Sequence, residues 1–297
     1  MTSQSEGPES ESYARELARR ALAEDGPNDI TSDIVFARGV AATGVLEFRS
    51  GGVLAGLTYA AAVLAECDLE AEWEVSEGTA VSHKRTIGTI TGDLADVLRA
   101  ERPMLNLLQR ACGIATATRA FVTAVVGTGC RILHTRKTAP GLRQLDIDSV
   151  LAGGGHQHRL GLHDAVLVKD NHWHVLAGYG RELELALEEA RSRGCTGLYV
   201  EVESLDQVKA ACAAQATRLL IDNQLPEAVA EWGTIARDSN PGIEIEASGG
   251  ITLDNVRGYA VAGVDFVSVG ALTHSVVAAD LALEIREGEI AAAGNDP

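Results

Sequence analysis

The chain has 297 residues, enough for one large α/β domain or for a barrel with a smaller second domain. Its formal net charge of −17 and pI near 4.8 argue against duplex nucleic acid as a partner, because neutralising phosphates requires a basic face. No window approaches ~18 uninterrupted apolar residues and the N-terminus lacks an apolar segment, so we expect neither a membrane span nor a signal peptide. Five cysteines without C-x-x-C spacing predict reduced thiols in a cytoplasmic protein.

The first third of the chain predicts a small mixed domain. Residues 1–11 are rich in Ser and Glu and predict a disordered tail. Apolar residues then recur at helical spacing from Ser12 to Glu24, and DGPND ends that helix. Short strand-like runs follow, with one helix among them near residues 58–67; they lie at 42–50, 51–56, 69–78 and 84–93.

A long helix is predicted from about Ala95 to 126, and after Gly129 the pattern changes to strands alternating with helices. Such alternation is typical of a parallel sheet with right-handed crossovers. Because no Rossmann glycine fingerprint is present, we expect an incomplete β/α barrel over 116–275. We also expect a final helix (281–290), within the segment 276–297, that returns to the N-terminal domain. The six predicted strands are 130–135, 164–170, 197–202, 218–222, 243–248 and 266–270, and predicted helices include 182–192, 205–214 and 253–262.

The carboxyl ends of these strands carry most of the positive charge, and active sites of β/α barrels lie at that face. Residues 131–172 contain six Lys/Arg against four Asp and no Glu, a balance of +2 that leaves −19 for the rest of the chain. A local cationic site for a small anion bearing several carboxylates or phosphates is therefore predicted. Its candidate cations are Arg136, Lys137, His158, Arg159 and Lys169.

The last two strands end in glycine-rich turns that predict a phosphate site. Ser248-Gly249-Gly250 precedes a helix predicted from about Thr252, and Gly270-Ala271 follows the sixth strand. Such turns present free backbone N–H groups, and barrels often bind phosphate after their final strands. Two adjacent turns opposite a cationic cluster favour phosphate binding over simple tight strand ends.

Glu201 and Asp222 end neighbouring strands, and two readings of them stay open. They could hold hydrated Mg²⁺, which takes one or two carboxylates plus substrate oxygens. Alternatively each pairs with Lys137, Lys169 or Arg159 in a buried network, and we expect both readings to hold in part. A zinc site at the H-x-H pairs 156/158 and 172/174 is a weaker alternative, since closed zinc sites need further ligands.

A series of motifs follows one after another along the chain: EDGPNDITSD, GGVLAGL, ERPMLNLLQRACGIAT, TRKTAPGLR, GGGHQHRLGLHDAVLVKDNH, VEVESLDQ, IDN, EASGGIT and GVDFVSVGALTHS. Taken in order, these motifs resemble the quinolinate phosphoribosyltransferase family, also called decarboxylating nicotinate-nucleotide pyrophosphorylases. The resemblance covers roughly residues 12–285, and no single motif carries it alone.

The resemblance implies an N-terminal α/β sandwich (12–115), a seven-stranded incomplete barrel and a homodimer or higher oligomer. Transfer of phosphoribose from phosphoribosyl pyrophosphate to quinolinate, with decarboxylation, is the implied reaction of NAD biosynthesis. The acid would be held by Arg136, His158, Arg159 and Lys169, with Arg102 reaching in from a neighbouring subunit. Phosphoribosyl pyrophosphate and its Mg²⁺ would be served by Lys137, Glu201 and Asp222, and its 5-phosphate by Ser248, Gly249, Gly250, Gly270 and Ala271.

Three departures from the family pattern bear on the acceptor. His134 replaces a usual Asp, Gln157 replaces a usual Asn, and Ile147-Asp148-Ser149-Val150 stands where many members have Lys-Tyr-Ala-Val. A paralogue that uses another pyridine or azole carboxylate, including a molybdenum-transport-associated branch, is therefore an alternative. A Schiff-base aldolase with Lys169 as nucleophile and a non-catalytic anion sensor are alternatives of other classes.

Overall fold

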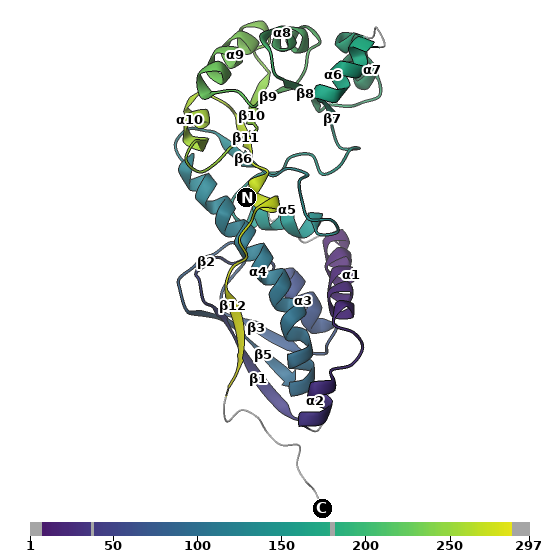
Figure 1. Ribbon diagram of the computed structural model, residues 1–297, viewed down its shortest axis with the longest axis vertical. Helices are drawn as coiled ribbons and strands as arrows, with labels where there is room; N and C mark the ends of the chain where they lie inside the picture. The colour runs from purple at the N-terminus through teal and green to yellow at the C-terminus, as the bar shows by residue number, and fades with distance from the viewer. Residues whose placement is uncertain (1–7, 37–38, 179–181, 287–297) are drawn as a thin grey trace, which may run out of the picture. The chain divides into compact units, whose positions relative to one another are not determined.

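The structure is a computed structural model that describes residues 8–36, 39–178 and 182–286 (Figure 1). The chain divides into two compact units. The first comprises residues 1–119, 139–154 and 276–297, and the second comprises 120–138 and 155–275. In the described residues, no helix is both long and apolar enough to cross a membrane.

The first unit is built on a four-stranded antiparallel sheet in the order β12-β1-β5-β3. Burial alternates along β1, so one face of this sheet packs on the core while the other faces solvent. The strands are β1 (Ala41–Phe48), β3 (Glu70–Trp73), β5 (Arg85–Asp93) and β12 (Leu281–Ile285), and β2 (Gly52–Val53) pairs with β4 (Ala80–Val81). The helices are α1 (Pro8–Glu24), α2 (Ile30–Val35), α3 (Leu57–Ala65), α5 (Arg143–Ala152) and most of α4 (Leu94–Ala124).

Three predictions about this unit need correction. The helix predicted at 281–290 is a strand, because Leu281, Leu283 and Ile285 alternate and pair with the open edge of β1. Residues 287–290 lie outside the described part. The disordered tail predicted for 1–11 is too long, because helix α1 already begins at Pro8. Proline suits the first position of a helix, where its missing N–H group has no intrahelical partner to lose. Residues 1–7 are likewise outside the described part.

Residues 139–154 were expected within the barrel, but they group with the first unit. Asp146, fully buried, accepts two hydrogen bonds of 2.7 Å from Arg110 of α4. Asp148 accepts a 2.6 Å bond from the Tyr59 hydroxyl. Gly153 packs so closely on α4 that a Cβ there would lie 2.6 Å from the carbonyl oxygen of Ala115. These long-range contacts were not visible as any local pattern.

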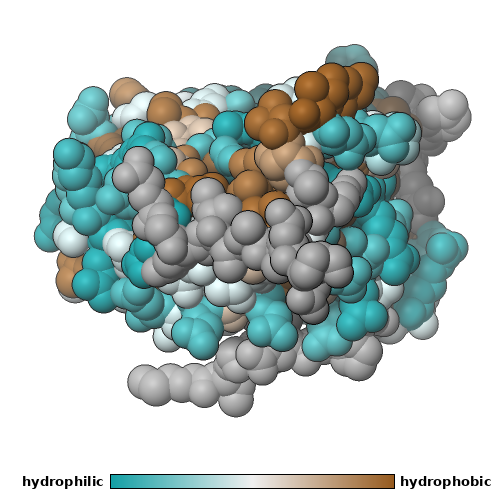
Figure 2. All heavy atoms as spheres, turned by 90° about the horizontal axis from the view of Figure 1, so that it is seen from below, coloured by the Kyte–Doolittle hydropathy of each residue, from teal (hydrophilic) through white to brown (hydrophobic). Residues whose placement is uncertain are grey.

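Helix α2 leaves an apolar surface uncovered on the first unit. Ile30, Ile34 and Val35 are 72%, 78% and 69% exposed. Figure 2 shows the strongly apolar side chains that stand out from the mainly polar surface on this side of the chain.

The second unit contains a six-stranded parallel sheet in the order β6-β11-β10-β9-β8-β7. Within this unit β6, the first strand along the chain, pairs with β11, the last strand, as in a barrel. In contrast, β6 and β7 lie at opposite edges of the sheet and do not pair with each other. An isolated parallel bridge between Leu133 and His156 extends the β6 edge, where a seventh strand would lie. The predicted α/β class with an incomplete barrel is confirmed. The strands are β6 (Arg131–Leu133), β7 (Val166–Val168), β8 (Leu198–Val202), β9 (Arg218–Asp222), β10 (Glu244–Ser248) and β11 (Phe266–Ser268).

Helices follow the strands and, in Figure 1, lie around the outside of the sheet. The predicted helix 253–262 begins only at Val256, because a turn closed by Asn255 intervenes: its side-chain oxygen accepts the Thr252 N–H at 2.8 Å. The helices are α6 (Asp170–Gly178), α7 (Leu183–Ser192), α8 (Leu205–Ala213), α9 (Pro226–Ser239), α10 (Val256–Val261) and α11 (Ala271–His274).

The two faces of this sheet differ sharply in polarity. Successive residues of a strand face opposite sides, and residues paired in register face the same side. One face carries fully buried aliphatic side chains, among them Val200, Leu219, Ile221, Ile245 and Val267. The opposite face carries the polar and aromatic set Tyr199, Glu201, Arg218, Asp222, Glu244, Glu246, Ser248 and Phe266.

Candidate active site

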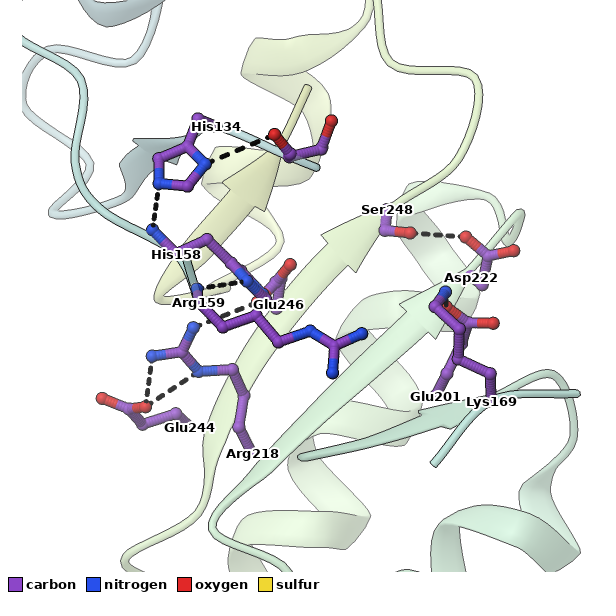
Figure 3. Close-up of polar contacts among 11 residues, drawn as sticks. His134, His158, Arg159, Lys169, Glu201, Arg218, Asp222, Glu244, Glu246 and Ser248 are labelled. Carbon is purple, nitrogen blue, oxygen red and sulfur yellow. Dashed lines mark hydrogen bonds and ion pairs between the residues drawn. The ribbon is translucent and has the colours of Figure 1, made fainter. Parts of the chain in front are cut away.

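The candidate site lies at the carboxyl ends of the parallel strands of the second unit. Asp222 and Ser248, the last residues of β9 and β10, are register partners. Lys169 follows β7 directly, and Glu201 is the penultimate residue of β8. Figure 3 shows these four residues near one another, with the Arg159 side chain extending towards Lys169 and Glu201.

Arg136 and Arg159 are the strongest indication of a ligand. Arg159 is 9% exposed, and one of its guanidinium nitrogens donates to the Ala165 carbonyl at 3.3 Å. Burial lowers the Arg159 pKa and the positive charge of Arg136 lowers it further, with Glu201 and Asp164 acting in the opposite direction. Among the described residues, the buried Nε of Arg136 has no hydrogen-bond partner. Two neighbouring guanidinium groups, one with an orphaned buried donor, form a site that suits an anion.

Lys169 and Glu201 form an ion pair, so the pairing alternative is confirmed for Glu201. Glu201 is nearly buried, whereas the Lys169 side chain is 43% exposed and stays accessible. Their backbones are fixed by neighbouring aromatic side chains. The Lys169 N–H donates to Nδ1 of His172 at 3.0 Å, and the Trp173 indole N–H donates to the Glu201 carbonyl at 2.8 Å.

The Asp222 carboxylate is held by a hydrogen bond on each oxygen. The Ser248 hydroxyl donates to Oδ1 at 2.5 Å, and the Asn223 amide donates to Oδ2 at 2.6 Å. Asn223 adopts a left-handed backbone (φ 53°), and Gly249 also has positive φ (83°). A Cβ at Gly249 would lie 2.2 Å from the Asn223 side-chain oxygen, so only glycine fits. The turns after β9 and β10 are thus packed against each other.

The turn after β11 brings Lys137 and His274 together over Gly270. A Cβ at Gly270 would lie 3.0 Å both from Cδ of Lys137 and from Nε2 of His274. The Thr273 hydroxyl donates to the Lys137 carbonyl at 2.8 Å, which ties the two segments. Sequence reasoning missed His274 as a member of the site, although it lies one helical turn after Gly270 and could have been found from that spacing.

Of the residues predicted to bind the acid, His158 is among the most deeply buried. Its side chain is 8% exposed, and its Nε2 lies 3.4 Å from a carboxylate oxygen of Glu246. Its Nδ1 accepts the Arg159 N–H at 2.7 Å. The fully buried His134, one of the departures from the family pattern, accepts the His158 backbone N–H at 3.0 Å. Contact of His158 with an acid therefore stays a prediction, while its contacts with protein groups are clear.

Other predicted residues belong to the first unit. Arg102 lies on α4, with a 58% exposed side chain 3.6 Å from Glu101. Asp148 is held by Tyr59 and Gln144, and its pKa is raised mainly by burial. The Ile147-Asp148 departure thus falls in that unit's own packing, whereas Gln157 is an exposed residue of the second.

Metal and thiol chemistry are limited by the donor groups present. In the described ranges, no group of three or more His, Cys, Asp or Glu side chains could hold a metal, so the zinc alternative gains no support. All five cysteines are free thiols. Burial raises the pKa of Cys112 to about 12 and that of Cys130 to about 11, so these two stay protonated and make poor nucleophiles.

Comparisons with known proteins agree across both units. Residues 29–112 match the model of the quinolinate phosphoribosyl transferase N-terminal domain, and residues 114–284 match that of the C-terminal domain. The nicotinate-nucleotide pyrophosphorylase [carboxylating] of Mycobacterium leprae is 39% identical over 279 residues, covering 92% of this chain and 97% of the relative. A mitochondrial quinolinate phosphoribosyltransferase [decarboxylating] of Nicotiana tabacum is 35% identical, covering 91% and 82%. The solved nicotinate-nucleotide pyrophosphorylase of Francisella tularensis superposes with a TM-score of 0.87 at 32% identity, covering 96% and 100%.

Proposed function

Because the chain belongs to the quinolinate phosphoribosyltransferase family, we propose that it transfers phosphoribose from phosphoribosyl pyrophosphate to quinolinate. The products are nicotinate mononucleotide, pyrophosphate and CO₂, a step of NAD biosynthesis. The observation that carries this proposal is the Arg136–Arg159 pair, whose charges and orphaned Nε suit the two adjacent carboxylates of quinolinate. A cytoplasmic setting is supported by the five free thiols.

The reaction needs charge stabilisation more than proton transfer. The pyridine nitrogen attacks ribose C1, and the electron pair of the breaking C1–O bond leaves with pyrophosphate. The 2-carboxylate then departs as CO₂, and its ring carbon takes a proton from water. Since the attacking nitrogen has no proton to lose, a site of oriented cations without a nucleophile–base pair suits this chemistry.

The chain's own residues divide between the two substrates. Arg136, Arg159 and Lys169 would bind the acid, and Lys137 with His274 would face the phosphate groups beside Gly270. Backbone N–H groups of the tightly packed turns at Ser248–Gly250 and Gly270–Ala271 would contact the 5-phosphate. Glu201 would hold Lys169 in place through their ion pair. Asp222, whose carboxylate is oriented by the Ser248 hydroxyl, would face the ribose of phosphoribosyl pyrophosphate.

The donor set around Asp222 fits a magnesium ion. Each Asp222 oxygen accepts one hydrogen bond and keeps a further lone pair, and Mg²⁺ takes one or two carboxylates plus water and substrate oxygens. Asp222 would be the direct ligand, with Glu201, already paired with Lys169, contributing through water. When bound, the ion would neutralise part of the pyrophosphate charge.

The alternatives of other classes are less well supported. A Schiff-base lysine needs a free amino group to attack a carbonyl, whereas the Lys169 amino group is engaged in an ion pair with Glu201. A decayed anion sensor would not need the Lys137–Gly270–His274 cluster in addition to the arginines. A paralogue with another pyridine carboxylate as acceptor is the remaining alternative, since its site would share these features.

One assay separates these possibilities. Purified protein with quinolinate, phosphoribosyl pyrophosphate and Mg²⁺ is expected to release pyrophosphate and CO₂ in equal amounts. Nicotinate, which lacks the 2-carboxylate, serves as the matched substrate and should be a poor acceptor. Pyrophosphate without CO₂ from a different acid would favour the paralogue, and ligand binding without turnover would favour the sensor. Borohydride trapping on Lys169 would favour the aldolase.

A shared site in a homodimer is proposed for Arg102, in keeping with its 58% exposed side chain. Arg102→Ala should fold normally but lose at least about tenfold in kcat/KM, the effect of one lost charge-assisted bond. Mixing it with Lys137→Ala should restore up to about a quarter of the activity, because subunit exchange forms some intact sites. Absence of rescue, after subunit exchange is demonstrated by mass, would contradict site sharing.

A further inference from the structure

The polar face of the parallel sheet holds a buried ionic group centred on Glu246. Among the described residues predicted to bind the acid, His158 is the one that contacts it. Glu246 of β10 is fully buried, and one of its carboxylate oxygens is 3.2 Å from Arg218 and 3.4 Å from Nε2 of His158. Ser248, two residues further along the same strand and on the same face, lies at the site. Glu246 therefore lies one layer below the site, out of reach of a substrate.

Arg218 is fixed more firmly than an ordinary ion-pair partner. It donates two hydrogen bonds to Glu244, at 2.9 and 2.8 Å. Its guanidinium carbon lies 4.0 Å from the centre of the Phe266 ring and 4.6 Å from that of Tyr199. A cation held by two aromatic rings and by the Glu244 carboxylate gives Glu246 a partner in a fixed position.

The hydrogen bonds of His158 define its tautomer. Its Nδ1 accepts the Arg159 backbone N–H, and because an N–H group can only donate, Nδ1 carries no proton. The ring proton is therefore on Nε2, which faces Glu246. The same logic applies to His134, whose Nε2 accepts the His158 N–H while Nδ1 faces the Thr135 carbonyl. Both ring nitrogens of His158 are thus used within the protein (Figure 3).

This arrangement fixes the backbone from which Arg159 extends. The ring of His158 anchors the Arg159 N–H, and the backbone of His158 is anchored by His134. Burial alone would raise the Glu246 pKa, but His158 and Arg218 outweigh it and keep the pKa below its usual value. The carboxylate is therefore charged at neutral pH and can orient the Nε2–H of His158.

We propose that Glu246 is a positioning residue for acid recognition, acting through His158 to set the orientation of Arg159. This role rests on the proposed function and deepens it: the specificity for a vicinal dicarboxylate would depend on a carboxylate that never touches it. His158 would then serve the acid site by holding Arg159, with its own nitrogens turned towards the protein.

The variant Glu246→Gln tests this role. It keeps the side-chain size but loses the charge that orients His158. We expect the KM for quinolinate to rise at least about tenfold, since misplacing a binding group by about 1 Å has large effects. The KM for phosphoribosyl pyrophosphate should stay within twofold. Loss of packing alone would lower the unfolding temperature and the fraction of active enzyme without changing the KM for one substrate.

Glu244→Gln is the matched control. Glu244 lies on the same strand, accepts bonds from the same Arg218, and has a 43% exposed side chain. It should weaken the Arg218 contact yet leave the quinolinate KM within twofold. An equal rise in the quinolinate KM for both variants would overturn the specific link from Glu246 to His158.

A double-mutant cycle with His158→Asn completes the test. Asn can still accept the Arg159 N–H but cannot reach Glu246, so the single variant should raise the quinolinate KM. Adding Glu246→Gln to it should change that KM by less than twofold, because the two residues act in series. If Glu246→Gln does not fold, an unchanged quinolinate KM in His158→Asn alone overturns the proposal. A wild type that fails to turn over quinolinate would overturn the proposed function itself, whereas an active wild type with additive variants overturns only the positioning role.

Discussion

Arg159→Met is expected to lower kcat/KM for quinolinate about a thousandfold. The guanidinium is nearly buried and donates a hydrogen bond to the Ala165 carbonyl, and within the described part of the chain its other donors are left for a carboxylate. Two charge-assisted bonds at ~1.5–3 kcal/mol each, with a factor of ten per ~1.4 kcal/mol, give an effect of this order. Steady-state kinetics with varied quinolinate would measure it, and the KM for phosphoribosyl pyrophosphate should hardly change.

Arg191→Met is the control for this change. Arg191 also donates to a backbone carbonyl, that of Ala214 at 3.1 Å, but lies on α7 away from the strand ends. It should retain nearly full activity. A loss in Arg159→Met of less than about tenfold would mean that this guanidinium does not bind the acid.

Lys137→Ala should reduce kcat by about a hundredfold to a thousandfold, the usual effect of removing one group that stabilises charge in the transition state. Lys137 is exposed at the end of its segment, and its Cδ packs over Gly270 beside His274. Charge develops on the departing pyrophosphate, so the loss should appear in kcat more than in the quinolinate KM. Lys209→Ala, an exposed lysine on α8, is the control. A change mainly in the quinolinate KM would assign Lys137 to the acid instead.

Local patterns predicted the elements of the second unit well because the strands are short, apolar and regularly spaced. All six predicted strands are present, and their order explains why charged residues 30 or more positions apart come together. Their carboxyl ends could be read directly from the chain. The position of Lys169 beside Glu201 followed from adjacent strand ends alone.

What the sequence could not predict depends on long-range contacts. Leu281–Ile285 has helix-forming residues, and its strand conformation comes from pairing with β1. Glu246 precedes the glycine turn by only two residues, yet nothing local indicates that it lies beneath His158. Likewise His134 could be recognised as a departure from the family, but only the structure shows that it accepts a backbone N–H as a carboxylate could.

The contrast between the two faces of the parallel sheet has an evolutionary consequence. A substitution on the aliphatic side disturbs the packing that keeps the unit folded, whereas one on the polar side near the carboxyl ends of the strands changes chiefly which anion is held. Specificity for a new acceptor could therefore arise through substitutions on the polar face while the aliphatic face keeps its packing. Descendants of one scaffold could come to use different acids without ever passing through an unfolded ancestor.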